Sequence, residues 1–372
     1  MTRSLYLDHN ATAPLRPEAM AAVNAALALT GNASSVHGFG RAARRLIEEA
    51  RQSVAAFAGA APAGVVFTSG GTEANNLALS GHGGAGILVS AGEHPSVLNA
   101  APQAQRLALL PDGRLDLVAL AAALKAAQST AQAPILVSVM WANNETGVLQ
   151  PVREIAEIAH RHAALFHCDA VQAAGKLPLA MAEIGIDFMS LSAHKIGGPQ
   201  GVGALVLAPG REVAALLRGG GQERSYRAGT ENLPGIAGFG AAARAAMAAL
   251  SKQPELTQLR DRLETGLRGL APEVRIFGAE APRLANTSCF GVPALKAETQ
   301  VMALDLAGVA VSAGSACSSG KVEPSHVLEA MGASAAEAAT AIRVSFGWDS
   351  SARDVDDFLA AWAALYSRCH AA

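Results

Sequence analysis

Short apolar runs alternate with longer segments of helical period through the first half of the chain. Six of these runs are apolar along almost their whole length: 65–69, 87–90, 135–140, 165–169, 188–192 and 203–207. Helical patterns, such as those over 41–57 and 153–162, separate most of them. Strands without polar alternation are covered on both faces, so the pattern predicts an α/β fold with a mainly parallel sheet.

The second half of the chain has a different pattern. An Ala-rich helix is predicted from 235 to about 250, followed by a break at 251–254 and a second helix to 270. Beyond it, the runs RIFG, NTSCF, VAVSAG and AIRVSFG precede a C-terminal helix at about 352–367. This arrangement predicts a smaller α+β domain with a boundary near 251–256.

Composition and charge narrow the class of protein. Hydrophobic residues make up 51% of the 372 positions and charged residues 16%, which excludes a disordered chain. The net charge is -2, with no basic block for nucleic acid or an anionic membrane. No apolar run reaches the ~18–20 residues of a membrane helix. Asp8 lies where a signal peptide would have its apolar stretch. We therefore expect a cytoplasmic enzyme without nucleic acid or membrane partners.

The four cysteines predict one reactive thiol. No CxxC pair occurs, so the spacing predicts neither a disulfide framework nor a metal site. Cys168 and Cys289 lie in apolar surroundings typical of buried thiols. Cys317 lies in SAGSACSSGK, among small and polar residues, where we expect an accessible loop.

Polar residues follow the predicted strands, at the sheet edge where such folds bind ligands. Gly70–Glu73 opens a helix whose N–H groups suit a phosphate, although an ordinary glycine turn fits equally well. The residues after the other strands are His94, Asn144, Asp169, Gln172, His194 and Lys195. Each alone is more often a turn or cap residue. Together they supply a Schiff-base lysine, an acid for a ring nitrogen and an anion cradle, which is the set that pyridoxal phosphate needs.

Nine motifs in order carry a resemblance to a known family. They are YLDHNATAP, FTSGGTEANN, EHPSV, ANNETGV, HCDAVQAAGK, SLSAHKIGGPQGVGAL, GGGQERSYRAGTEN, SAGSACSSG and IRVSFG. They closely resemble the NifS/IscS-type cysteine desulfurases, in the class V aminotransferase group with PLP-dependent transferase fold type I. The resemblance implies a large domain, 15–255, with a mainly parallel seven-stranded sheet. It also implies a small α+β domain, 1–14 and 256–372, that carries the loop of Cys317.

The resemblance also implies a role for each matching residue. Lys195 would carry pyridoxal 5'-phosphate as a covalent aldimine and move the substrate Cα proton, and His94 would stack on the ring and take part in proton transfers. Asp169 would pair with the ring nitrogen and Gln172 with the phenolic oxygen. The implied phosphate-binding residues are Gly71, Thr72, Ser192, His194 and, from the partner subunit of a homodimer, Thr230. Arg343 and Asn144 would bind the substrate carboxylate, and Cys317 would be the nucleophile.

The implied reaction converts L-cysteine to L-alanine and leaves the sulfur as a persulfide on Cys317, for an acceptor such as an iron–sulfur scaffold. His9-Asn10, Ala193 and Ala313 are tolerable departures from the family pattern. A selenocysteine lyase shares the fold and nearly all the motifs, so that alternative stays open. An aminotransferase or decarboxylase would not need Cys317. An inactive partner-binding homologue would have lost at least one of the residues that carry the chemistry, and all are present: Lys195, Asp169, His94, Arg343 and Cys317.

Overall fold

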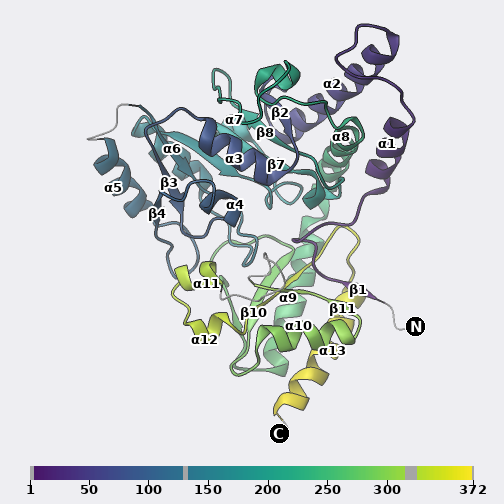
Figure 1. Cartoon of the computed structure of the whole chain (residues 1–372). Helices are drawn as coiled ribbons and strands as arrows, with labels where there is room; N and C mark the ends of the chain where they lie inside the picture. Colours follow the sequence, from purple (N-terminus) through teal and green to yellow (C-terminus); the bar gives the residue numbers. More distant parts are fainter. Residues whose placement is uncertain (1–3, 129–132, 315–324, 371–372) are drawn as a thin grey trace.

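A seven-stranded sheet forms the centre of the larger lobe in the computed structural model, which describes residues 4–128, 133–314 and 325–370 (Figure 1). The strand order is β2-β8-β7-β6-β5-β3-β4. The bounds are β2 (Val65–Thr68), β3 (Gly86–Ser90), β4 (Gln105–Leu107), β5 (Ile135–Ser138), β6 (Leu165–Asp169), β7 (Phe188–Ser192) and β8 (Gly203–Leu207). β8 pairs antiparallel with both neighbours, and the other pairs are parallel. The predicted fold class is confirmed.

Strand β4 is the one strand of this sheet that the apolar pattern did not predict. It is three residues long, and only its last residue, Leu107, is buried. An edge strand with two exposed side chains has no continuous apolar run, so hydrophobicity alone cannot identify it.

Alternate residues of each strand face two different layers of helices. Val65 and Phe67 pack into one hydrophobic cluster, while Val66 between them packs into another. Helices of the first layer are α1 (Pro17–Leu27), α2 (Gly38–Ala58), α5 (Leu117–Gln128), α6 (Val152–Arg161), α7 (Met181–Ile184) and α8 (Leu233–Ala248). Those of the second are α3 (Gly71–Gly81) and α4 (Pro95–Leu98). Burial on both faces explains why the strands lack polar alternation.

The smaller lobe is built on an antiparallel sheet of order β12-β13-β10-β9. Its strands are β9 (Arg275–Ile276), β10 (Thr287–Gly291), β12 (Ser312–Ala313) and β13 (Ile342–Ser345), and β1 (Leu5–Tyr6) pairs separately with β11 (Val309–Ala310). Its helices are α9 (Gln253–Leu270), α10 (Ala297–Leu306), α11 (His326–Ala330), α12 (Ala335–Ala338) and α13 (Ala352–His370). The Phe290 ring lies edge-on to Phe358 and Trp362, with centroids 6.3 and 6.0 Å away. Leu5 and Leu7 share this core, and on that basis we propose the domains 15–255 and 1–14 with 256–372.

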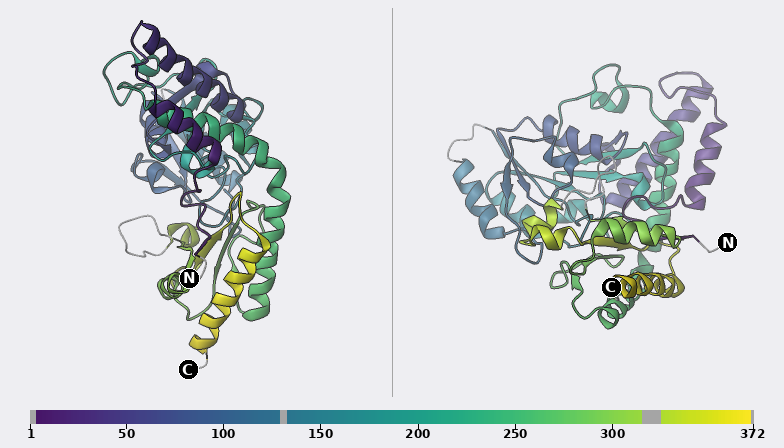
Figure 2. Two further views of the ribbon diagram at one scale, coloured as in Figure 1. Left: turned by 90° about the vertical axis from the view of Figure 1, so that its right-hand side faces the viewer. Right: turned by 60° about the horizontal axis from the view of Figure 1, so that its bottom comes forward.

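The helical path between the lobes is continuous, as the left view of Figure 2 shows. The break predicted at 251–254 is a single 3-10 turn, η4 (Ala249–Lys252), between α8 and α9. Pro254 lies in the first turn of α9, where its missing N–H breaks no helical hydrogen bond.

One helical run bears on the expectation that no segment of the chain spans a membrane. Leu233–Leu270 is, by length and composition, a helical run that could cross a membrane, with an 18-residue window of mean hydropathy 1.3. Within the fold, 56% of that window is buried. Packing of α8 against α1 and α2 accounts for the apolar residues.

Candidate active site

The ends of β7 and the start of α3 enclose a cavity of about 500 Å³ at the edge of the large sheet. Four residues predicted to bind phosphate line it: Gly71, Thr72, Ser192 and His194. Gly71 permits a close approach, because a Cβ at this position would lie 2.8 Å from Val171 Cγ2. The start of α3 therefore packs against Val171, and the same Cβ would lie 3.5 Å from Ser192 Cβ.

The donors around this cavity suit a phosphate. Gly70, at the N-cap of α3, has no side chain to bond the first N–H groups of the helix, so these remain for a ligand. Glu73, the acidic residue of this turn, is neutralised by Arg227, whose Nε lies 2.9 Å from its Oε1. Burial, and then the Lys195 charge, lowers the pKa of His194 to about 4, so its imidazole is neutral.

Thr230 does not line this cavity in a single chain. It lines a neighbouring one of about 120 Å³, and Ser69 and Gly201 border both. The expectation that Thr230 reaches the phosphate of a partner subunit stays a prediction.

Asp169 ends β6 as a fixed carboxylate, 6% exposed. Its Oδ2 accepts a hydrogen bond from Asn75 Nδ2 at 2.7 Å, and its Oδ1 accepts one from the Val171 N–H at 3.0 Å. Both oxygens are thus held in place, as orientation toward a ring nitrogen requires.

Asn75 connects Asp169 to His94 through a third residue. Its Nδ2 also donates to Ser96 Oγ at 2.9 Å, and Ser96 Oγ lies 2.8 Å from His94 Nδ1. Asn75 and Ser96 lie within the motifs FTSGGTEANN and EHPSV, but the sequence interpretation gave them no role. The structure identifies Asn75 because it is a buried asparagine, 1% exposed, whose amide must find partners, and burial is not visible in the sequence.

Lys195 lies in η2 (Ala193–Ile196), directly after β7. Its Nζ donates to the Asn10 and Ala11 carbonyls at 2.6 and 2.8 Å. The N-terminal segment therefore orients the predicted Schiff-base amine from outside the sheet.

Gln172 is held by Asn10 and by Lys176, a second lysine that the sequence interpretation did not assign. Its Nε2 donates to the Asn10 carbonyl at 2.9 Å, and its Oε1 accepts from Lys176 Nζ at 2.8 Å. Lys176 also donates to Asn10 Oδ1 at 3.0 Å. Burial, then the charges of Lys195 and Arg343, holds the pKa of Lys176 well below its usual value.

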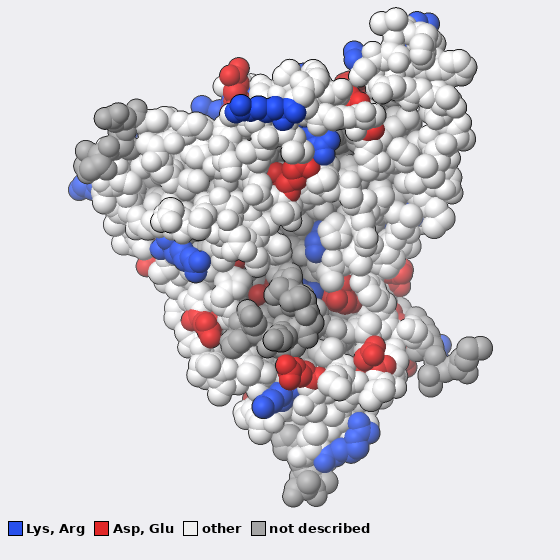
Figure 3. Space-filling model, viewed as in Figure 1, with Lys and Arg blue, Asp and Glu red and all other residues white. Residues whose placement is uncertain are grey.

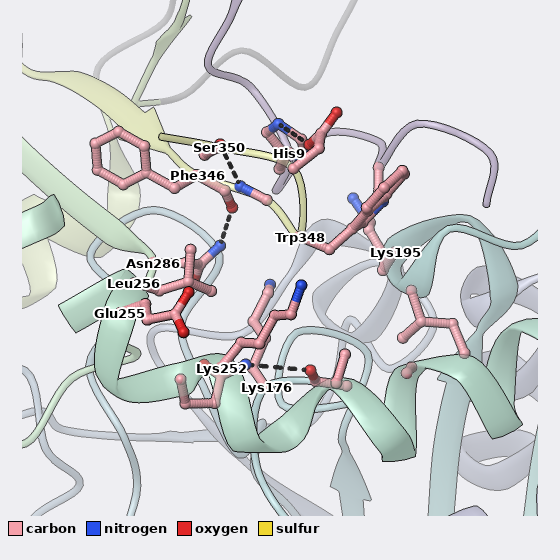
Figure 4. Close-up of a pocket in the computed structure, with 18 of the residues that line it drawn as sticks. His9, Lys176, Lys195, Lys252, Glu255, Leu256, Asn286, Phe346, Trp348 and Ser350 are labelled. Carbon is pink, nitrogen blue, oxygen red and sulfur yellow. Dashed lines mark hydrogen bonds and ion pairs between the residues drawn. The ribbon is translucent and has the colours of Figure 1, made fainter. Parts of the chain in front are cut away.

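A second cavity, of about 180 Å³, lies where the two lobes join (Figure 4). Lys176, Lys195, Lys252, Asn286 and Trp348 are among its lining residues. Asn286 Nδ2 lies 3.2 Å from Asn10 Oδ1. Asn10, whose carbonyl accepts from Lys195 Nζ, therefore also contacts a residue that lines this cavity.

Arg343 comes from the smaller lobe, in the middle of β13. Its side chain is 7% exposed, and it donates to Asp8 Oδ1 at 2.6 Å and to the Asn144 carbonyl at 2.8 Å. Its buried Nε has no partner among the described residues. Asn10 Nδ2, 3.4 Å from the same Asn144 carbonyl, joins Arg343 to the Lys195 side of the site.

Figure 3 shows that the surface is hollowed between the lobes on the face of Figure 1, with basic side chains in the hollow. Cys317, the predicted nucleophile, lies outside the described residues. The described ends of its segment are Gly314 and Ser325, and both lie beside Glu145: Ser325 Oγ donates to its Oε2 at 2.5 Å, and a Cβ at 314 would lie 3.2 Å from that atom.

Comparison with known proteins identifies the family. The aminotransferase class-V model matches residues 5–358. The chain belongs to this family. A cysteine desulfurase of Cereibacter sphaeroides is 45% identical over 370 residues, covering 95% of this chain and 94% of that protein. The cysteine desulfurase IscS of Dictyoglomus turgidum is 40% identical over 371 residues, covering 96% and 93%.

Solved structures agree with this placement in the class-V family. A NifS-like protein from Rickettsia africae superimposes with a TM-score of 0.90 at 35% identity, covering 98% of this chain and all of that one. The predicted NifS/IscS-type membership is confirmed. It implies the use of pyridoxal phosphate in general, and the residues present fit that cofactor: an uncapped helix N-terminus, a fixed carboxylate and a lysine meet at one sheet edge.

Proposed function

We propose that this chain is a cysteine desulfurase that converts L-cysteine to L-alanine and takes the sulfur onto Cys317. The observation that carries the proposal is that Lys195 and Arg343 both bond the N-terminal segment 8–11, while Asp169 and Lys195 both lie close enough to His94 to shift its pKa. The chain that holds them is 45% identical to a cysteine desulfurase. An aminotransferase of the same family would share these three residues, so the sulfur step distinguishes the two.

The sheet edge would bind and orient the cofactor. When bound, pyridoxal phosphate supplies an aldehyde for Lys195 and a ring that draws electrons from the substrate carbon. Gly71, Thr72, Ser192 and His194 would hold its phosphate, Asp169 its ring nitrogen and Gln172 its phenolic oxygen.

Arg343 would bind the substrate carboxylate. The guanidinium already bonds a carboxylate, that of Asp8, and its buried Nε remains for a second acceptor. A planar guanidinium binds a carboxylate through two parallel N–H groups. With the carboxylate held there, assisted by Asn144, Lys195 takes the Cα proton on Nζ.

Cys317 would accept the sulfur. Its thiolate attacks the substrate sulfur, the carbon–sulfur bond breaks, and the bonding electron pair stays with the carbon, which then takes a proton. Cysteine and an enzyme thiol thus become alanine and an enzyme persulfide, without an external oxidant. The persulfide then passes to an acceptor such as an iron–sulfur scaffold protein, in the cytoplasm.

We also propose that the active form is a homodimer in which Thr230 completes the partner's phosphate site. In support, large apolar side chains are exposed in α1, in α2 and between them: Leu27 is 66%, Val36 88% and Phe39 67% exposed. Light scattering of the active protein should give twice the chain mass, and an active monomer would contradict this.

The test of the function is the release of alanine and sulfide from L-cysteine under dithiothreitol. Wild type should release both in equal amounts. Cys317→Ser should release less than about a hundredth of the sulfide, because a hydroxyl is a far weaker nucleophile than a thiolate. Alanine without sulfide, or full sulfide release by Cys317→Ser, would contradict the proposal. L-Selenocysteine in the same assay tests the selenocysteine lyase alternative.

A further inference from the structure

The contacts of His94 determine which of its ring nitrogens carries the proton. The backbone N–H of Ser96 donates to His94 Nδ1 at 3.1 Å. A backbone N–H can only donate, so Nδ1 must present a lone pair. In the neutral imidazole the proton therefore lies on Nε2.

The rest of the chain of contacts agrees with this assignment. Because Nδ1 has no hydrogen, the Ser96 hydroxyl, 2.8 Å away, donates to it as well. The hydroxyl oxygen then accepts from Asn75 Nδ2 at 2.9 Å. The Asp169 carboxylate can only accept, so it too faces the Asn75 NH2 group, at 2.7 Å.

The orientation of the Asn75 amide leaves one of its polar atoms unpaired. Its Oδ1 is buried without a partner among the described residues. A flipped amide would place that oxygen against the Asp169 carboxylate and remove the donor from Ser96. A buried amide oxygen left unpaired costs free energy, and the two bonds made by Nδ2 offset it.

We propose that Asn75 and Ser96 are positioning residues that fix His94 as the neutral Nε2–H tautomer. This inference rests on the proposed function, and it assigns His94 the role of an N–H donor in the active site. Protonation of His94 would place a hydrogen on Nδ1 against the Ser96 N–H. Lys195 then carries out the proton transfers at the substrate carbon. The family resemblance implied that His94 takes part in proton transfers, and the proposal limits it to donating a hydrogen bond.

The surrounding charges agree with a neutral His94. Burial lowers the pKa of His94, Asp169 opposes that shift, and Lys195 and His326 add to it. His326 approaches from α11, where its Nε2 lies 2.9 Å from the Glu93 carbonyl oxygen.

The test is nitrogen and carbon NMR of histidine-labelled protein without cofactor, with the His94 signal assigned by its loss in His94→Gln. Wild type should show protonated Nε2 and unprotonated Nδ1, and His94 should titrate at a lower pH than an ordinary histidine. Asn75→Ala frees the Ser96 hydroxyl to turn and accept a hydrogen bond from Nδ1. We expect the His94 titration in that variant to move upward, toward that of an ordinary histidine.

The matched control is Asn76→Ala, the same change one position along α3. Asn76 Nδ2 bonds the Thr72 carbonyl at 2.8 Å and touches neither Asp169 nor the Ser96 hydroxyl. Ser96→Ala should move the His94 titration upward, as Asn75→Ala does, and Asn76→Ala should leave it unchanged. A protonated Nδ1 in wild type would overturn the inference even if both variants failed to fold, and so would equal titrations in Asn75→Ala and Asn76→Ala.

This readout separates the inference from the proposed function. The NMR signals need neither substrate nor turnover, so a chain that makes no alanine would leave the tautomer assignment standing. Conversely, alanine production with His94 protonated on Nδ1 would overturn only the inference.

Discussion

The two lobes position their parts of the site in different ways. In the larger lobe, Asp169 and Lys195 are placed where the backbone leaves the sheet, at the end of β6 and directly after β7. In the smaller lobe, Arg343 lies within a strand, with its guanidinium balanced by Asp8 from the N-terminal segment. The sheet edge is thus preorganised by topology, whereas the smaller lobe depends on a buried ion pair between distant parts of the chain.

The largest expected effect tests the sheet edge. Lys195→Ala should reduce turnover at least about a thousandfold, because it removes both the covalent attachment and the amine that moves the Cα proton. The visible absorbance of purified wild type incubated with pyridoxal phosphate should also be lost. Turnover in the variant at a tenth of the wild-type rate would break the assignment of Lys195.

Arg343→Lys tests the smaller lobe separately. Lysine keeps the charge but loses the two-pronged contact, so KM for L-cysteine should rise roughly 10- to 100-fold. The cofactor spectrum should stay that of wild type, because Arg343 contacts Asp8 and Asn144 and none of the predicted cofactor residues. A changed cofactor spectrum with an unchanged KM for L-cysteine would contradict this assignment, in which the larger lobe binds the cofactor and Arg343 of the smaller lobe binds the substrate.

The same contrast explains how far the sequence predicted the site. Apolar strands followed by polar residues point to Asp169 and Lys195 by local pattern alone, since strand ends meet at one edge. The role of Arg343 came from family resemblance, because nothing local distinguishes a buried arginine in IRVS from a surface residue. Asn75, Ser96, Lys176 and Asp8 act through hydrogen bonds between distant segments, which no local pattern encodes.

Glu145, where the lobes meet, should give the stability of the protein a pH dependence. Burial raises its pKa from 4.5 to about 7, with Ser325 and Arg343 opposing. Between pH 4.5 and about 7 the folded chain holds a proton on Glu145 that the unfolded chain has released. The stability that Glu145 contributes is therefore fully present below pH 4.5 and is lost as the pH rises through about 7. Across this range the free energy of unfolding falls by about 3 kcal/mol at most.

Glu145→Gln removes this titration while keeping an oxygen that can accept a hydrogen bond from Ser325. Urea unfolding at several pH values should show the variant gaining stability relative to wild type as the pH rises toward 7. A difference between the two proteins that does not change with pH would contradict the raised pKa.

The smallest effect is expected at Cys289, a fully buried thiol of the smaller lobe. Burial holds the pKa of this thiol far above its usual value, so it is not a nucleophile. Cys289→Ser should lose about 1–3 kcal/mol of stability from a buried hydroxyl and keep desulfurase activity within about twofold. Loss of sulfide release in a well-folded variant would mean that the reactive thiol has been misassigned.

The most direct test of the central claim is the position of the sulfur after one turnover. Wild type should be treated with L-cysteine, without a reductant, then digested and examined by mass spectrometry. The account predicts one additional sulfur on the peptide that contains Cys317, and none on those containing Cys168, Cys289 or Cys369. An additional sulfur on one of those three, or none on any peptide while alanine accumulates, would contradict it.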